Sequence, residues 1–290
     1  FERSSGVSLD SGVPGLFTYK GYHDLFRKKI ANIAQQSSEE NWVLDPDKKS
    51  LSAPEIEQLQ TDLQQLYFTD YVSTWRQTLD DVAVTRFSNL RHATEVLEIL
   101  SGPVSPMRSL LLAVEKNTSL DAAGGLLATI KDQAGQALST KNRLARLMQS
   151  APDDELVPQA GRPEAIVGRQ FEAVNSLVRA PDGGTAPIEQ LINLLSQLYG
   201  QFDSMSVGMG SDVLGMAQGT GSDIIRRIQV EAARQPEPVK HWLQQIASNS
   251  RTVTMGGARD QINQEWQATV APVCSRALSG RYPFDSNGTQ

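Results

Sequence analysis

The sequence contains one cysteine, Cys274, among 290 residues. A single thiol excludes an internal disulfide framework and any zinc site built from several cysteines. It is compatible with both reducing and oxidising compartments, so cysteine usage does not identify the compartment of the protein. Because Cys274 falls in a predicted helix beside Val270, Ala277 and Leu278, we expect a buried core residue rather than a nucleophile.

Long apolar runs and an excess of basic residues are also missing. No stretch approaches the ~20 apolar residues that span a bilayer, and the mean hydropathy is -0.33. The formal net charge of -6 and the isoelectric point near 5.2 disfavour nonspecific binding of nucleic acid, and no basic stripe is interleaved with aromatic residues. We therefore expect no nucleic acid as a partner.

Recognisable catalytic and cofactor motifs are absent as well. His23, His92 and His241 stand far apart, without other ligands at metal-binding spacing, so neither a metal nor a cofactor is predicted. No GxSxG nucleophile motif occurs. The glycine-rich stretch 206–221 matches no phosphate-binding pattern, and we expect a loop or a weakened helix there. The sequence therefore predicts no enzyme.

What the sequence does contain is helical periodicity, strongest from Ser52 to Val82. Ser52 and Glu55 match a capping box, and Pro54 suits the first turn. A predicted apolar stripe consists of Ile56, Leu59, Leu63, Leu66, Tyr67 and Thr74. Asp70 falls within this stripe, where an unpaired carboxylate is costly. We expect Asp70 to be a buried structural acceptor; the alternative is a general acid or base with a shifted pKa.

Helical patterns continue beyond this element, whereas strand signals are almost absent. Gly102 and Pro103 end one helix, with the glycine suited to a left-handed cap, and Pro106 begins another. The helices that begin near Pro163 and Ile188 should pair as an antiparallel hairpin. The sequence predicts an all-α fold, an elongated bundle of about ten helices.

Composition shifts suggest the domain organisation. Residues 1–15 predict an extended lead-in, 16–150 a first helical subdomain, 151–161 a linker rich in proline and acid, and 162–280 a second helical subdomain. Residues 281–290 would connect to a further domain. Because the chain begins at Phe1 without a signal-peptide pattern, we expect a segment of a longer protein.

Four stretches, in this order, resemble the IcmF-related family, the TssM proteins of type VI secretion systems. They are VPGLFTYKGYHDLF (13–26), LYFTDYVSTWRQTLDDV (66–82), RFSNLRHATEVLEILSGPVSPMRSLLLAVEKNT (86–118) and ALSGRYPF (277–284). The order of four separate motifs makes the resemblance more specific than any one of them. It extends from about Val13 to Phe284.

The resemblance implies a non-enzymatic structural subunit of the secretion membrane complex. Family members have a cytoplasmic portion and transmembrane helices, then a mostly helical periplasmic region, then a C-terminal β-rich domain. This chain would be the periplasmic region and the start of that domain, with Tyr282, Pro283 and Phe284 at the junction. Implied partners are a TssL-like inner-membrane protein, further copies of the chain, and a TssJ-like outer-membrane lipoprotein bound mainly through the β-rich domain.

Two other classes of function stay open from the residues alone. A periplasmic hydrolase or peptidoglycan-binding module would use Asp70 with Asp80 or Asp81, and it requires these carboxylates to line an open cleft. Asp80 and Asp81 are consecutive, so on a helix they point ~100° apart. The third possibility is a soluble helical adaptor unrelated to secretion.

Overall fold

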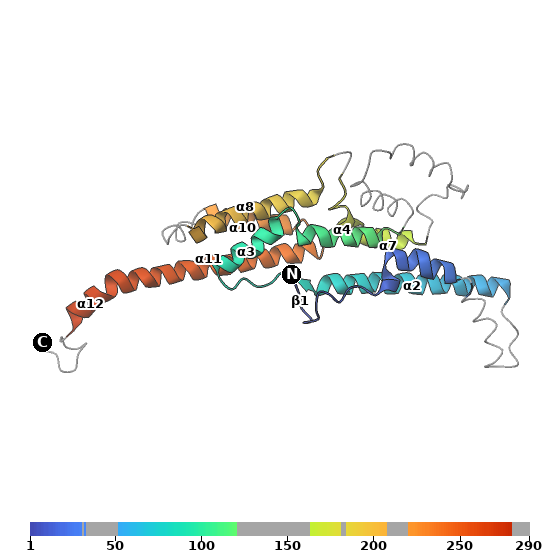
Figure 1. Cartoon of the computed structure of the whole chain (residues 1–290), viewed down its shortest axis with the longest axis horizontal. Helices are drawn as coiled ribbons and strands as arrows, with labels where there is room; N and C mark the ends of the chain where they lie inside the picture. The colour runs from blue at the N-terminus through green and yellow to red at the C-terminus, as the bar shows by residue number, and fades with distance from the viewer. Residues whose placement is uncertain (31, 33–51, 121–162, 181–183, 208–219, 280–290) are drawn as a thin grey trace. The chain divides into compact units, whose positions relative to one another are not determined.

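A computed structural model describes residues 1–30, 32, 52–120, 163–180, 184–207 and 220–279. These ranges are mostly helical, which confirms the predicted all-α class (Figure 1). The α-helices are α2 (Ala53–Asp81), α3 (Leu90–Ser101), α4 (Pro106–Thr118), α7 (Ala165–Asn175), α8 (Pro187–Val207), α10 (Thr220–Ala232), α11 (Val239–Glu265) and α12 (Ala271–Leu278). Shorter segments are η1 (Gly15–Phe17), η2 (Gly21–Phe26) and η5 (Trp266–Val270), and strand β1 (Glu2–Arg3) pairs with β2 (Val82–Ala83).

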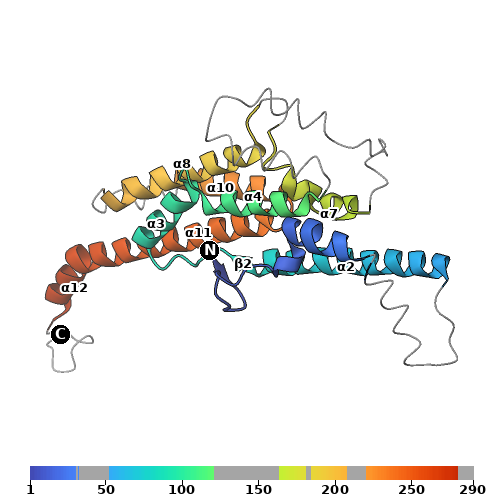
Figure 2. The ribbon, with the colours of Figure 1, turned by 45° about the vertical axis from the view of Figure 1, so that its right-hand side comes forward.

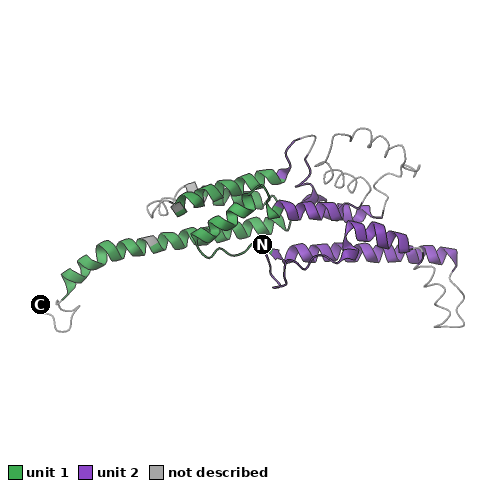
Figure 3. Ribbon diagram, in the orientation of Figure 1, with its two compact units in different colours: residues 1, 83–107, 188–290 green, residues 2–82, 108–187 purple. Residues whose placement is uncertain are grey.

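The chain forms two compact units, each assembled from separate stretches (Figure 3). Unit 1 consists of Phe1, Ala83–Met107 and Ile188–Gln290, and unit 2 of Glu2–Val82 and Arg108–Pro187. The division differs from the predicted subdomains 16–150 and 162–280 because the chain changes unit within the first of them, after Val82 and after Met107.

The structure describes both helices of the predicted hairpin but not the predicted linker. Residues 151–161 lie outside the described residues. The hairpin of α7 with α8 is not found within either unit, because α7 belongs to unit 2 and α8 to unit 1. The sequence pattern located both helices but did not contain the information about which neighbours bury them.

Unit 2 is built around α2, which packs against η1 and α7. Its predicted start is confirmed: the Ser52 backbone N–H and hydroxyl both donate to a Glu55 carboxylate oxygen at 2.7 Å, and Pro54 lies in the first turn. The buried face of α2 consists of Tyr67, Phe68, Tyr71, Val72, Trp75 and Leu79. Burial is thus concentrated in the C-terminal half of the helix.

Asp70 lies on the exposed face of α2, so the prediction that it is a buried acceptor is wrong. The predicted stripe included Leu66, which is 59% exposed. The buried positions begin one residue later, at Tyr67, and recur at Tyr71 and Trp75. One residue turns a helix by ~100°, which carries Asp70 away from the core.

In unit 1, α11 is the central helix, with α10 along it and α3 against it (Figure 1 and Figure 2). Trp242 on α11 is fully buried, and the ring of Phe1 packs edge-on against it at a centroid distance of 5.2 Å. The Gln245 side-chain oxygen accepts a hydrogen bond from the Val84 backbone N–H at 2.8 Å. These contacts attach the start of unit 1 to its central helix.

Helix α11 continues through Gly256 near the end of unit 1. The ~1 kcal/mol cost of an interior glycine is offset by buried neighbours such as Val253 and Ala258. One prediction about the end of unit 1 is wrong. Cys274 is exposed rather than buried, because α12 has no buried residue.

The stretch Leu90–Thr118 has the length and mean hydropathy, 1.2, to cross a membrane by composition alone. It is not one continuous helix, because α3 ends at Ser101 and α4 begins at Pro106. Gly102 between them is extended, with φ -69° and ψ 169°, rather than in the predicted left-handed conformation. Leu97 and Leu111, on either side of this corner, are fully buried core residues.

Candidate functional site

Unit 2 contains a cluster of aromatic side chains where α2 meets η1 and η2. We call it the aromatic cluster; its members are Phe17, Tyr19, Tyr22, His23, Phe26, Tyr67, Phe68, Tyr71 and Trp75. Phe26 and Tyr67 stack at a centroid distance of 3.7 Å and an interplanar angle of 10°, and Phe17 lies edge-on to Tyr71 at 5.9 Å. Such aromatic pairs contribute about 0.5–1.5 kcal/mol each beyond their buried area.

Three polar groups of the cluster, all on α2, donate to backbone carbonyls. The pairs are Tyr67 Oη to Leu16 O at 2.7 Å, Trp75 Nε1 to Phe17 O at 2.8 Å, and Tyr71 Oη to Asn117 O at 2.5 Å. The side-chain oxygen of Asn117 in turn accepts from the Tyr19 backbone N–H at 3.1 Å. Buried backbone carbonyls that are not bonded within a helix or sheet need hydrogen-bond partners. The side chains of α2 supply these partners and thereby hold η1 and the end of α4 in place.

Burial sets the protonation states in the cluster. It raises the pKa of Tyr22 to about 12, with a smaller contribution from Glu164, and it raises the pKa of Tyr67 and Tyr71 well above the ordinary range. Burial also lowers the pKa of His23, whose Nε2 lies 3.1 Å from the Leu120 carbonyl oxygen. The tyrosine hydroxyls and the imidazole are therefore neutral donors near pH 7 and act in packing.

A second polar network in unit 2 joins the end of α4 to α7. Thr118 and Asn175 are both fully buried, and the Asn175 amide donates to the Thr118 hydroxyl at 2.9 Å. Beside them the Arg179 guanidinium forms ion pairs with Glu115 at 3.2 Å and Glu172 at 3.1 Å. The buried pair is satisfied within the unit, as buried polar groups require.

Two of the four resembling motifs, and the end of a third, meet in unit 2. Residues 13–26 form η1 and η2, residues 66–82 supply the buried face of α2, and Asn117 near the end of the third motif accepts the Tyr71 hydroxyl. Reasoning from the sequence did not assemble this cluster, although the density of aromatic residues in the first two motifs was a usable signal. The fourth motif lies largely outside the described residues, with Tyr282, Pro283 and Phe284.

The carboxylates of the hydrolase alternative do not come together. Asp80 lines a groove of about 460 Å³ between α2 and α7, together with Phe68 and Ile166, but Asp70 does not line it. Asp70 and Asp80 are ten positions apart, which corresponds to about 15 Å along the helix axis, against the ~5–9.5 Å that separates paired catalytic carboxylates in glycosidases. This geometry does not support carboxylate-pair catalysis.

Asp81, the third of these carboxylates, binds the N-terminal stretch of unit 2. It accepts hydrogen bonds from the Ser5 backbone N–H at 2.7 Å and the Ser5 hydroxyl at 2.6 Å, and Arg3 lies 3.7 Å away. The hydroxyl of Ser5 is the main cause that lowers the pKa of Asp81. Asp81 therefore fastens the start of the chain to the end of α2.

The histidines are not gathered into a metal site. His92 contacts Ser88 just before the start of α3, and His241 contacts Gln245 within α11, whereas His23 belongs to the aromatic cluster. Within the described ranges, no group of three histidine, cysteine, aspartate or glutamate side chains is placed to hold a metal ion.

Comparison with known proteins begins with the protein family and the fold. Residues 1–119 match the family model described as "IcmF-related: Intracellular multiplication and human macrophage-killing". A chain of a solved "Type VI secretion system membrane core complex" has a similar fold, with a TM-score of 0.55 at 16% identity, over 94% of this chain and 48% of that one. The chain is thus similar to IcmF-related proteins over its first 119 residues, as the four motifs predicted, and its fold resembles that of a type VI secretion membrane core protein.

The similarity to one particular protein covers the whole chain. Over 296 aligned residues it is 32% identical to "Type VI secretion system component TssM1" of Pseudomonas aeruginosa. The alignment takes in 100% of this chain but 26% of TssM1. The chain therefore spans about a quarter of the curated relative that it matches.

Proposed function

We propose that this chain is a non-enzymatic structural segment of a type VI secretion membrane complex, a periplasmic scaffold in the path from the inner membrane to an outer-membrane lipoprotein. The observation that carries the proposal is the 32% identity to TssM1 along the full length of the chain. The proposed partners are a TssL-like inner-membrane protein, a TssJ-like lipoprotein and further copies of the chain.

The contacts of α2 support a role in which rigidity matters. At ~1.5 Å per residue, its 29 residues extend about 43 Å, and three side-chain donors fix its buried half to the surrounding backbone. The groove that Asp80 lines has no second carboxylate among its described lining residues. A long helix clamped by buried aromatic residues is suited to holding attachment points at a fixed spacing.

The compartment can be tested through Cys274, which is exposed on α12 and is the one cysteine of this chain. The parent protein in its native host is treated with a membrane-impermeant maleimide after the outer membrane alone has been permeabilised. We expect labelling that is lost in a Cys274→Ser variant, which controls for cysteines elsewhere in the parent. Labelling of Cys274 only after the inner membrane is broken would contradict the periplasmic assignment.

The scaffold role has its own test. The parent protein is purified from membranes, with and without the aromatic cluster disrupted by Trp75→Ala. We expect the wild-type protein to co-purify with the lipoprotein and the inner-membrane partner of the system, and the variant to lose these partners in proportion to its loss of folded protein. A variant that is unfolded in this segment but keeps every partner would show that the segment is not part of the scaffold.

A further inference from the structure

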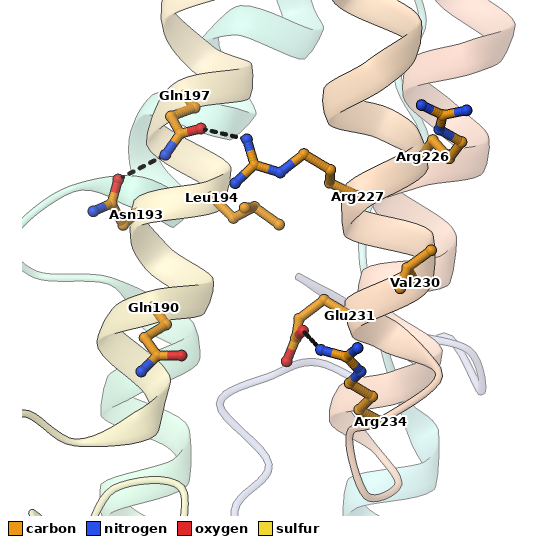
Figure 4. Close-up of a pocket in the computed structure, with 9 residues that line it drawn as sticks. All are labelled: Gln190, Asn193, Leu194, Gln197, Arg226, Arg227, Val230, Glu231 and Arg234. Atoms are coloured by element: carbon orange, nitrogen blue, oxygen red, sulfur yellow. Dashed lines mark hydrogen bonds and ion pairs between the residues drawn. The ribbon is translucent and has the colours of Figure 1, made fainter.

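Unit 1 carries a groove of about 470 Å³ between α8 and α10 (Figure 4). Its two walls have the same order of side chains: Gln190, Leu194 and Gln197 on α8, and Arg227, Val230 and Arg234 on α10. In each wall an apolar residue stands between two polar ones that are seven positions apart, about 10.5 Å along the helix. The groove is thus apolar in the middle and polar at both ends.

The groove is basic, although the chain as a whole is acidic. Three arginines and one glutamate line it, an excess of two positive charges in a chain of net charge -6. The Arg227 guanidinium reaches across to α8 and donates to the Gln197 side-chain oxygen at 3.3 Å (Figure 4). Among the described residues, no carboxylate forms an ion pair with Arg227, so most of its five donors face the groove or solvent.

The other two arginines of the groove form exposed ion pairs that another carboxylate can replace. Arg226 pairs with Asp223 at 2.8 Å and Arg234 with Glu231 at 3.4 Å, each within α10. Both arginine side chains are more than 70% exposed, and ion pairs at that exposure contribute only about 0–1 kcal/mol. A better-placed carboxylate can therefore replace either partner at little cost.

We propose that this groove binds an acidic amphipathic helix of a partner protein. An apolar side chain at the centre of that helix would contact Leu194 and Val230, the latter 53% exposed in the free chain. Carboxylates on either side of it, seven residues apart, would pair with Arg227 and Arg234, and guanidinium–carboxylate pairs are the stronger kind of hydrogen bond. Helices commonly dock in grooves through anchors at such spacings.

The shape of the groove suits an acidic helix better than a small anion. A free phosphate or a single carboxylate would engage one arginine and leave the apolar middle exposed. A helix satisfies both ends and the middle together, because its own seven-residue spacing matches that of the two walls. The inference does not depend on the proposed secretion role, since it rests on the side chains of α8 and α10 alone.

The test uses the full chain and a designed helical peptide of about 15 residues, with glutamates seven positions apart around a central leucine. The matched peptide has glutamine at both glutamate positions. By fluorescence anisotropy we expect the glutamate peptide to bind at least about tenfold more tightly than the glutamine peptide. Raising the salt concentration from about 50 to about 300 mM should weaken the binding of the glutamate peptide, since exposed charges are screened.

The variants locate the binding. Arg227→Gln with Arg234→Gln should weaken the glutamate peptide at least about tenfold, whereas Arg259→Gln, which removes an exposed charge on α11 outside the groove, should not. All of these side chains are exposed, so the variants should fold; if the double variant does not, Arg227→Gln alone should weaken binding at least about threefold.

Two results would overturn the inference. One is equal binding of the two peptides, or equal weakening by the groove variants and Arg259→Gln. The other is self-association of the chain, seen by sedimentation and abolished by the groove variants, with no peptide binding, because the occupant would then be a second copy.

Discussion

At the scale of single residues, Tyr71 shows how the aromatic cluster combines packing with hydrogen bonding. Its ring is fully buried, and its hydroxyl donates to the Asn117 carbonyl. Trp75, one turn further along α2, has the same combination with Phe17. Asp70, one residue before Tyr71, has neither burial nor a role in this cluster. Neighbouring positions on one helix thus differ widely in what they contribute to stability.

We predict that Trp75→Ala lowers the free energy of unfolding by about 3–5 kcal/mol, because it removes a large buried side chain. Tyr71→Phe keeps the ring and loses one hydrogen bond, so it should cost about 0.5–1.5 kcal/mol. Asp70→Ala is the control on the exposed face of the same helix and should stay within about 0.5 kcal/mol of the wild type. Urea unfolding followed by tryptophan fluorescence and circular dichroism measures all three.

A large loss of stability in Asp70→Ala would contradict the exposed position of this carboxylate. The same ranking should appear in amide hydrogen exchange of the buried half of α2. If Tyr71→Phe were as damaging as Trp75→Ala, the hydroxyl would have a role beyond the one hydrogen bond.

His23 should make stability depend on pH. Burial lowers its pKa in the folded chain, so the unfolded chain binds the proton more readily, and stability falls as pH drops below the unfolded value near 6.5. In His23→Gln, whose amide can still donate to the Leu120 carbonyl, this loss should be smaller between about pH 7.5 and about pH 5.5. Unfolding midpoints of both proteins across that range test it; identical pH profiles would exclude a contribution from His23.

At the scale of elements, two glycines differ in whether the structure around them leaves room for a side chain. Gly256 lies inside α11 with open space where a Cβ would be, whereas a Cβ on Gly21 would overlap the backbone carbonyls of Gly15 and Leu16. These surroundings explain why a helix can run through the first position and why η2 packs so closely on η1 at the second.

We therefore predict opposite effects of alanine at the two glycines. Gly256→Ala should raise the free energy of unfolding by about 0.5–1 kcal/mol, because alanine restricts the unfolded chain and suits a helix. Gly21→Ala should lower it by more than that, since a backbone carbonyl must move. Thermal unfolding of the two variants compares them, and a stabilised Gly21→Ala would contradict the tight packing of η1 on η2.

The elements themselves were largely predictable from the sequence, and their neighbours were not. Local chemistry marked the ends of α2 and α3, through the Ser52–Glu55 capping box and Gly102, because caps involve residues close in sequence. Periodicity did not fix the orientation of α2, since an error of one residue rotates the buried face and had placed Asp70 inside. The aromatic cluster needed tertiary contacts such as that of Tyr71 with Asn117.

At the scale of the whole chain, two units interleave along one sequence. Unit 2 contains the clamped α2, and unit 1 contains the basic groove and the helix that continues through η5 into α12. Among the described residues, no group of three histidine, cysteine, aspartate or glutamate side chains is placed to hold a metal ion, and the groove beside Asp80 has no second carboxylate in its lining. The proposed scaffold role and the hydrolase alternative make different predictions for the carboxylates of α2, so mutation can separate the two hypotheses.

The central claim, that the segment acts through its structure rather than through catalysis, is tested by type VI secretion from strains whose parent gene carries defined substitutions. The account predicts that Asp70→Asn with Asp80→Asn leaves secretion at the wild-type level, while Trp75→Ala reduces it in proportion to the loss of folded protein. Loss of secretion in the Asp70 and Asp80 double variant, with an unchanged melting temperature, would contradict it.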